Sequence, residues 1–192
     1  MGKIYYVMGK SASGKDTIFK ELLKKCRGMK KIIPYTTRPQ RQGEKDGTEY
    51  HFTTPEKLKE FEKEKKLIEV RTYETEEGPW SYATVDDGSV DMNGRHDYLG
   101  IGTLESYAGM QKYYGAGNVV PVFIELDPGI RLQRALNREN MQKKPQYREM
   151  CRRFLADEED FSEDRLFAAG IRKRYVNEDL GKCLAGIMED MV

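Results

Sequence analysis

Hydrophobic positions in the first part of the chain follow two different periods. Residues 3–8 form a short apolar run that is typical of a buried strand, and the run stops at Gly9. After a glycine-rich turn, apolar side chains recur on one helical face at Ile18, Phe19, Leu22, Leu23 and Cys26. This spacing predicts a helix capped near Gly28, followed by a second short strand over residues 31–35.

A polar, loop-rich piece interrupts this pattern between about residues 35 and 90. Residues 36–50 are rich in Gly, Pro and Arg and predict a loop, whereas Thr54-Pro55-Glu56 has the capping residue and first-turn proline of a helix start. Residues 67–75 and 80–85 have the composition of two strands joined by a turn at Glu76-Glu77-Gly78-Pro79. We therefore interpret residues 35–90 as an insertion into a chain that otherwise alternates strands and helices.

Alternation of strands and helices resumes in the second half. Short strands are predicted at residues 98–101 and 174–176, and residues 119–126 are apolar almost throughout, as in a strand buried on both faces. Helices are predicted at residues 104–114, at two segments within 131–153 joined by a mobile tip around Pro145, and at the amphipathic segment that begins at Leu180. Such alternation predicts an α/β chain whose mainly parallel sheet is flanked by helices.

Composition and charge limit the possible functions. The 192 residues suffice for one compact domain with one or two small insertions, and 33 Lys and Arg against 32 Asp and Glu leave a net charge of +1. This balance argues against a nucleic-acid polymer or a membrane surface as partner, so anion recognition must be local. Three widely spaced cysteines and an N-terminus without a secretion pattern are typical of a reduced, cytoplasmic protein.

The most recognisable short motif lies between the first strand and the first helix. Residues 9–16 fit G-x-x-x-x-G-K, in which glycines clear the backbone, the helix start directs amides inward, and a lysine reaches the β and γ phosphates. The alternative is a glycine-rich turn that merely carries a surface lysine. We expect ATP to bind the following residues: Gly9, Lys10, Ser11, Ala12, Ser13, Gly14, Lys15, Asp16 and Thr17.

The motif is unusual at the position after its lysine. A hydroxyl that holds Mg²⁺ is expected there, but this chain has Asp16, followed by Thr17. Carboxylate oxygens are good ligands for Mg²⁺, although without a metal Asp16 would repel phosphates. We favour Asp16 as the metal ligand; an altered register that uses Thr17 is the alternative.

A second polar segment, residues 35–52, carries two arginines three positions apart, Arg38 and Arg41, together with Tyr50. Guanidinium forks match the oxygens of a phosphate monoester, and the proline and glycine turns would hold them on a loop. The alternative is a polar loop whose arginines pair with nearby glutamates.

Taken together, the two segments closely resemble the guanylate kinase family, whose pattern contains T-T-R and R-x-G-E-x-x-G, as in Thr36-Thr37-Arg38 and Arg41-Gln42-Gly43-Glu44. The resemblance continues at residues 67–70, 82–84, 134–138, 152–154 and 175–180. It implies a P-loop NTPase-type parallel-sheet core (residues 1–34, 91–130 and 160–192), an inserted β-rich GMP-binding domain (35–90) and an Arg-rich helical lid (131–159).

The resemblance also implies roles for individual residues. Arg38, Arg41, Tyr50 and Tyr82 would hold the GMP phosphate, while Glu69 and Thr84 would contact the guanine edge. Lys15 and Arg38, with the lid residues Arg134, Arg138 and Arg153, would be the catalytic cations. Taken alone, Glu69 is more typical of a strand-edge glutamate that faces water.

One departure from the family pattern concerns a carboxylate pair. The family has Asp-x-Asp after the inserted domain, whereas the matching positions here are Gly100 and Gly102, and the glycine expected after Tyr82 is Ala83. Guanine selectivity and rate are therefore in question, and a carboxylate at Asp16 would offset part of the loss.

The resemblance implies Mg²⁺-dependent transfer of phosphate from ATP to GMP by a monomer or homodimer. Alternatives are a kinase for another phosphorylated small molecule, a nucleotide sensor, or a phosphopeptide-binding module. The last class typically loses the lysine that is present here as Lys15.

Overall fold

Five parallel strands form the core sheet of the computed structural model, which describes residues 2–41, 43–75 and 78–191. The strand order is β2-β7-β1-β8-β9, with neighbouring strands paired in parallel throughout. The strands are β1 (Ile4–Met8), β2 (Lys30–Lys31), β7 (Tyr98–Ile101), β8 (Val119–Glu125) and β9 (Tyr175–Val176). The predicted α/β class with a parallel sheet is thus confirmed.

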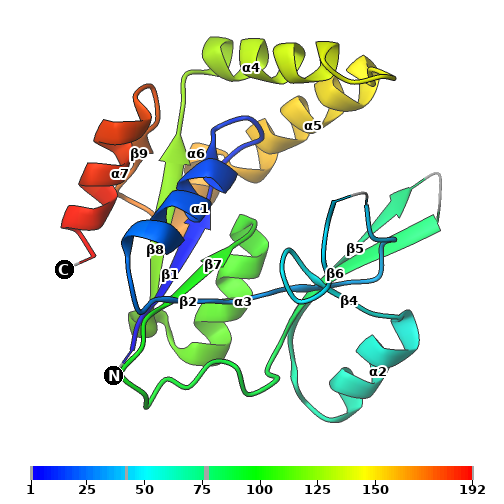
Figure 1. Cartoon of the computed structure of the whole chain (residues 1–192), viewed down its shortest axis with the longest axis vertical. Helices are drawn as coiled ribbons and strands as arrows, with labels where there is room; N and C mark the ends of the chain where they lie inside the picture. The colour runs from blue at the N-terminus through cyan, green and yellow to red at the C-terminus, as the bar shows by residue number, and fades with distance from the viewer. Residues whose placement is uncertain (1, 42, 76–77, 192) are drawn as a thin grey trace.

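Helices cover both faces of this sheet because its central strand is apolar on both sides (Figure 1). Ile4, Tyr6 and Met8 of β1 pack on one face, and Tyr5 and Val7 pack on the other. The first face is covered by α3 (Leu104–Tyr114) and α6 (Glu163–Ala168), and the second by α1 (Lys15–Lys25) and α7 (Leu180–Glu189). Burial of every β1 side chain explains the uninterrupted apolar run.

A second sheet lies beside the core, and all its strands fall within residues 35–85 (Figure 1). Its order is β4-β3-β6-β5, with β3 parallel to β4 and the other pairs antiparallel. The strands are β3 (Tyr35–Thr36), β4 (His51–Phe52), β5 (Leu67–Thr75) and β6 (Gly78–Val85). Helix α2 (Pro55–Lys63) belongs to this part and is capped by Thr54, as predicted.

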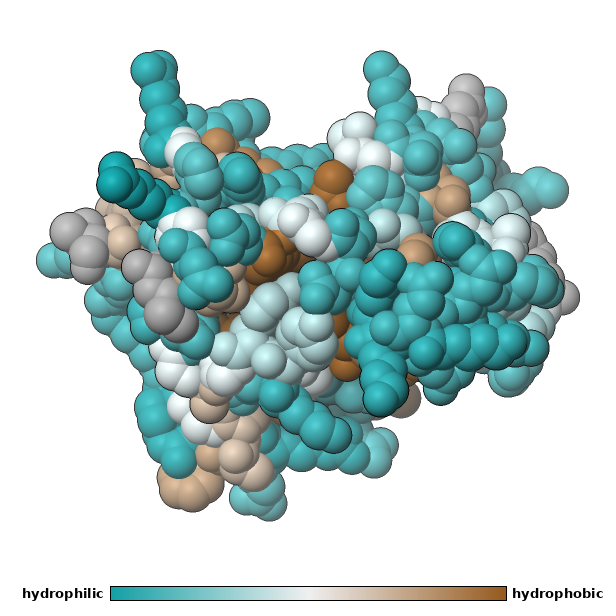
Figure 2. All heavy atoms as spheres, turned by 90° about the horizontal axis from the view of Figure 1, so that it is seen from below, coloured by the Kyte–Doolittle hydropathy of each residue, from teal (hydrophilic) through white to brown (hydrophobic). Residues whose placement is uncertain are grey.

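Two further helices, α4 (Pro128–Asn140) and α5 (Tyr147–Asp160), form an arm above the core sheet (Figure 1). A 3₁₀ turn (Ala116–Asn118) leads into β8. The opposite, lower face of the molecule is mostly hydrophilic, and its apolar atoms show chiefly in central recesses (Figure 2). This surface agrees with the 34% of charged residues in the sequence.

Three local predictions are corrected. The strand over residues 31–35 divides between the two sheets: the backbone amide of Ile32 still bonds to Leu99 in the core, while Pro34 supplies only its carbonyl, to His51 of the second sheet. Helix α1 ends at Lys25 with Cys26 as its cap, so Gly28 lies in the following turn rather than at the cap. Of the predicted turn Glu76-Glu77-Gly78-Pro79, Gly78 and Pro79 instead begin strand β6, and Glu76 and Glu77 lie outside the described residues. Helix α6 was not predicted.

Candidate active site

The connection between β1 and α1, here called the phosphate loop (residues 9–16), has the backbone of an anion cradle. Gly14 is the N-cap of α1 with a φ of 89°, and Ala12 is left-handed with a φ of 63°, a conformation that costs a non-glycine residue about 1 kcal/mol. A Cβ at Gly9 would lie 2.6 Å from the carbonyl oxygen of Ile124. The fully buried hydroxyl of Ser13 has no hydrogen-bond partner within the described residues.

Asn177 fixes the loop from the C-terminal part of the chain. Its buried side-chain amide donates to the carbonyl oxygen of Ser13 at 2.7 Å, and its own carbonyl accepts from Arg134 Nη2 at 3.3 Å. Asn177 lies in the C-terminal stretch that carried the resemblance, but no sequence pattern indicated its contact with the phosphate loop. Through these two hydrogen bonds, Asn177 connects the phosphate loop to the end of β9 and to the Arg134 guanidinium.

Two carboxylates of α5 contact the same loop. The backbone N–H of Ser11 donates to Asp157 Oδ2 at 2.6 Å, and Lys10 Nζ lies 2.5 Å from Glu158 Oε2. The other oxygen of Glu158 lies 2.9 Å from Nη2 of the buried Arg131. These anions contact Lys10 and Ser11, two of the residues predicted to bind ATP. The charge-dense helical pattern of α5 did not distinguish them from a solvated face.

The predicted catalytic cations are not all brought together. Lys15 is the first residue of α1, with Nζ 3.5 Å from the exposed Asp16 carboxylate. Of the three arginines predicted to belong to a lid, Arg134 is adjacent to the phosphate loop, whereas Arg138 and Arg153 are exposed. The Arg153 guanidinium lies 3.3 Å from the Glu149 carboxylate.

The second sheet presents a different cation, Arg38, in a buried setting. The side chain of Arg38 is 3% exposed, and its fork donates to both oxygens of Glu44 at 2.8 and 2.5 Å. Its guanidinium carbon lies 5.0 Å from the ring centre of Tyr50. The guanidinium lowers the pKa of Glu44 to about 2, so the pair stays ionised at neutral pH.

The other predicted acceptor residues surround this pair. Arg41 is exposed, and its backbone amide donates to Glu44 Oε2 at 2.9 Å. The rings of Tyr50 and Tyr82 meet edge to face with centres 5.8 Å apart, and burial raises the pKa of Tyr50. Arg38, Tyr50 and Tyr82 are therefore contiguous, while the Arg41 side chain points into solvent. The alternative reading of this loop, in which an arginine pairs with a nearby glutamate, also describes Arg38 correctly.

Glu69 and Thr84 meet on adjacent strands of the second sheet. The Thr84 hydroxyl donates to Glu69 Oε1 at 2.8 Å, and the Glu69 side chain is only 8% exposed. The picture of Glu69 as a water-facing strand residue is therefore wrong. A Cβ at Gly109 of α3 would lie 2.8 Å from Glu69 Cβ, so this glycine allows α3 to approach the glutamate closely.

Tyr6 of β1 occupies the space beside Gly100 and Gly102. A Cβ at Gly100 would lie 2.7 Å from the Tyr6 ring, and one at Gly102 would overlap the Tyr6 and Ser106 hydroxyls. These hydroxyls are hydrogen-bonded to each other at 2.8 Å, and burial raises the pKa of Tyr6. The Tyr6 side chain thus fills the space that aspartates at positions 100 and 102 would occupy.

Comparison with known proteins explains why a phosphate loop and a buried arginine loop occur in one chain. The sequence profile of the guanylate kinase family matches residues 1–190. The chain belongs to the guanylate kinase family. Membership in this family confirms the resemblance that the loop motifs indicated.

Sequence similarity to individual members is confined to shorter stretches. The guanylate kinase of Symbiobacterium thermophilum is 45% identical over 62 residues, which cover 32% of this chain and 28% of that protein. The guanylate kinase of Neisseria gonorrhoeae is 32% identical over 68 residues, covering 35% and 33%. That of Syntrophotalea carbinolica is 38% identical over 55 residues, covering 29% and 26%. The aligned part of this chain thus spans about a quarter to a third of these curated relatives.

Similarity of fold extends much further than similarity of sequence. The crystal structure of guanylate kinase from Anaplasma phagocytophilum superposes with a TM-score of 0.69, covering 99% of this chain and 84% of that one at 18% identity. At this identity the match establishes the shared fold.

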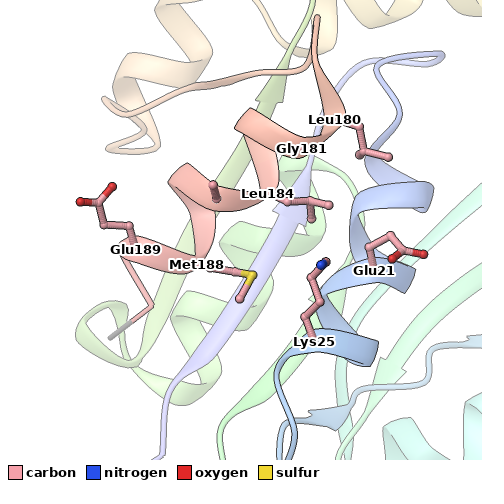
Figure 3. Close-up of a pocket in the computed structure, with 8 residues that line it drawn as sticks. Glu21, Lys25, Leu180, Gly181, Leu184, Met188 and Glu189 are labelled. Atoms are coloured by element: carbon pink, nitrogen blue, oxygen red, sulfur yellow. The ribbon is translucent and has the colours of Figure 1, made fainter.

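One other surface feature lies apart from the predicted site. A groove of about 570 Å³ runs between α1 and α7, lined by residues that include Glu21, Lys25, Leu184 and Met188 (Figure 3). It contains none of the predicted site residues. Within the described part of the chain, every helix is too short or too polar to cross a bilayer.

Proposed function

We propose that this protein transfers the γ-phosphoryl group of ATP to the phosphate of GMP, forming ADP and GDP. The observation that carries the proposal is that one chain contains two differently built sites, each suited to binding an anion. One is the phosphate loop with Lys15 at the start of α1, and the other is the buried Arg38 fork in the loop after β3. Membership of the guanylate kinase family supports this assignment.

The core (residues 1–34, 91–130 and 160–192) would bind ATP, and the inserted part (35–90) would bind GMP. Lys15 and the loop amides would hold the β and γ phosphates, and the orphaned Ser13 hydroxyl adds a polar group to the same cradle. Arg38 and Arg41, with the Tyr50 and Tyr82 hydroxyls, would aim the acceptor phosphate.

The phosphoryl transfer itself needs alignment and charge neutralisation. A GMP phosphate oxygen attacks the γ phosphorus as the bond to the bridging β oxygen breaks, and ADP leaves with that electron pair. The acceptor is already largely ionised, so no general base is required. Arg134, Arg138 and Arg153 of the proposed lid (residues 131–159) would neutralise charge on the transferring group and exclude water, with Arg138 and Arg153 moving inward.

Mg²⁺ suits the residues at the start of α1. Asp16 has a carboxylate with 76% exposure, and Thr17 beside it has an exposed hydroxyl, so both are hard oxygen ligands within reach of solvent and nucleotide. The bound ion would neutralise phosphate charge. In the described residues no cluster of three or more acidic, His or Cys side chains forms a preformed metal site, which fits an ion that arrives with ATP.

A coupled assay of ADP release tests the proposed activity, with ATP and a panel of GMP, AMP, CMP and UMP. ADP release is expected to require GMP, to stop on chelation with EDTA and to return with excess Mg²⁺. ADP release that is equal with and without an acceptor would contradict the proposal. Tight GMP binding without turnover would instead favour the nucleotide sensor, and phosphopeptide binding in place of GMP would favour the binding module.

Asp157 provides a prediction about the ATP side. Asp157→Asn removes the charge that the Ser11 amide now faces, so ATP should bind more tightly, because a hydrogen bond to a charged group contributes about 1.5–3 kcal/mol. We expect the ATP dissociation constant, measured by calorimetry, to fall about tenfold. Asp160→Asn, an exposed neighbour whose carboxylate pairs with Arg165, is the matched control. Equal affinities for the wild type and Asp157→Asn would show that Asp157 does not compete with phosphate.

A further inference from the structure

Arg71 forms a buried ion pair with Glu69, one of the two residues predicted to contact the guanine edge. Arg71 Nε lies 2.9 Å from Glu69 Oε2, and the side chains are 12% and 8% exposed. Both residues lie on β5, two positions apart, and so project from the same face of the strand. Burying two charges is costly unless each is well paired, so this arrangement fixes both groups in place.

The hydrogen bonds of Glu69 leave it little spare capacity. An ionised carboxylate has roughly four acceptor positions. Thr84 occupies one on Oε1 at 2.8 Å, Arg71 Nη2 approaches the same oxygen at 3.5 Å, and Arg71 Nε occupies one on Oε2. About one position remains, so Glu69 can accept one further N–H from a base.

Arg71, by contrast, retains donors. Its Nε and Nη2 face Glu69, and Nη1 donates to the Thr103 hydroxyl at 2.8 Å, at the N-cap of α3. Among the described residues these bonds use one N–H of each terminal nitrogen, so one N–H on each remains to donate to a ligand oxygen. The pair thus offers about one acceptor position on Glu69 and two N–H donors on Arg71.

No carboxylate adds to this pair from positions 100 and 102, where the family pattern has aspartates. Both are glycine, and the adjacent Tyr6 and Ser106 hydroxyls are already bonded to each other. The charged groups here are therefore the Glu69 carboxylate and the Arg71 guanidinium, whose charges sum to zero.

Building on the proposed function, we propose that Arg71 is a specificity-determining residue that reads the lactam edge of a 6-oxopurine monophosphate together with Glu69. Glu69 accepts the ring N1–H, and Arg71 donates to O6. The 2-amino group of guanine is then left unread. Hypoxanthine has the same lactam edge without the amino group, so IMP is accepted nearly as well as GMP. Adenine offers a weaker donor and a weaker acceptor in the reverse order, so AMP is a poor acceptor.

Initial rates with GMP, IMP and AMP at saturating ATP test the inference. We expect kcat/KM for IMP to lie within about tenfold of kcat/KM for GMP. For AMP we expect kcat/KM to be at least about a hundredfold lower, because AMP would leave polar groups of the site unpaired. A preference for GMP over IMP of more than about tenfold overturns the proposal, because it means that the 2-amino group is read. AMP used as well as IMP also overturns it. If no monophosphate is phosphorylated, the proposed function fails. The inference is then tested by calorimetry: dissociation constants for GMP and IMP within about tenfold of each other support it, and a larger preference for GMP overturns it.

Variants of Arg71 separate recognition from a structural role. Arg71→Met is expected to raise KM for GMP and IMP at least about thirtyfold and to leave KM for ATP unchanged, since it removes the donor to O6. Arg71→Lys keeps a charged donor of similar reach and should recover part of the loss. Arg27→Met, at an exposed site near the end of α1, is the control. Equal rises in KM for GMP and ATP, or a Lys variant no better than Met in a folded protein, would show that Arg71 only supports the fold.

Discussion

Lys15→Ala is expected to abolish measurable phosphoryl transfer while leaving the fold intact. Lys15 begins α1 at the phosphate loop and is partly exposed, so its removal creates no buried cavity. The lost cation at the β and γ oxygens should cost about 3–4 kcal/mol or more in a site that excludes water, which is at least about a hundredfold to a thousandfold in rate. The coupled ADP-release assay measures this loss, and circular dichroism checks the fold.

The matched control for Lys15 is Lys20→Ala, which removes an exposed lysine from the same helix. This variant should keep wild-type rates. Turnover by Lys15→Ala close to that of the control would show that residues 9–16 are only a turn and would remove the basis of the proposed activity.

Arg38→Met is expected to raise KM for GMP by about a hundredfold or more, with KM for ATP little changed. The substitution keeps the volume that packs against Tyr50 but removes the fork, and it leaves the Glu44 carboxylate facing an incoming dianion. Both the lost attraction and the new repulsion act on the acceptor. Steady-state kinetics with each substrate varied in turn measure the two KM values.

Arg41→Met provides the comparison on the same loop. Its side chain is exposed and makes no ion pair in the described structure, so we expect a smaller rise in KM for GMP. Equal rises in KM for ATP and GMP in Arg38→Met would indicate that Arg38 acts on closure or on the transferring phosphate. A double variant with Glu44→Gln should be less impaired than Arg38→Met alone, because the unpaired anion is gone.

Local sequence patterns correctly predicted those helices and strands that are determined by neighbouring residues in the sequence. Residues 119–125 are apolar on both faces because β8 lies inside a parallel sheet, and the Thr54-Pro55 pair placed the start of α2 correctly. The short helix α6 was missed because it has six residues, of which Leu166 is buried, and one buried position cannot show a helical repeat. The split of residues 31–35 depends on which sheet each residue joins, and periodicity contains no such information.

The candidate site shows the same limit. Lys15 and Arg38 were found because they lie in motifs of fixed spacing, and their catalytic roles stay predictions. Asp157, Asn177 and Arg71 matter through contacts with residues elsewhere in the chain: Asp157 and Asn177 meet the phosphate loop from more than 140 positions away. In sequence, Asp157 and Arg71 are ordinary charged residues of a helix and a strand.

The fit of Tyr6 against two glycines restricts how this protein can change over evolutionary time. Aspartate at position 100 or 102 would meet the Tyr6 ring or hydroxyl, so a carboxylate gained by a single substitution is penalised before it can contribute to binding. Replacing Tyr6 first would open a cavity in the core beside β1 and forfeit the bond to Ser106. Each route begins with a loss, and the present combination of tyrosine and glycines is therefore entrenched: the three positions can be exchanged together but not one at a time.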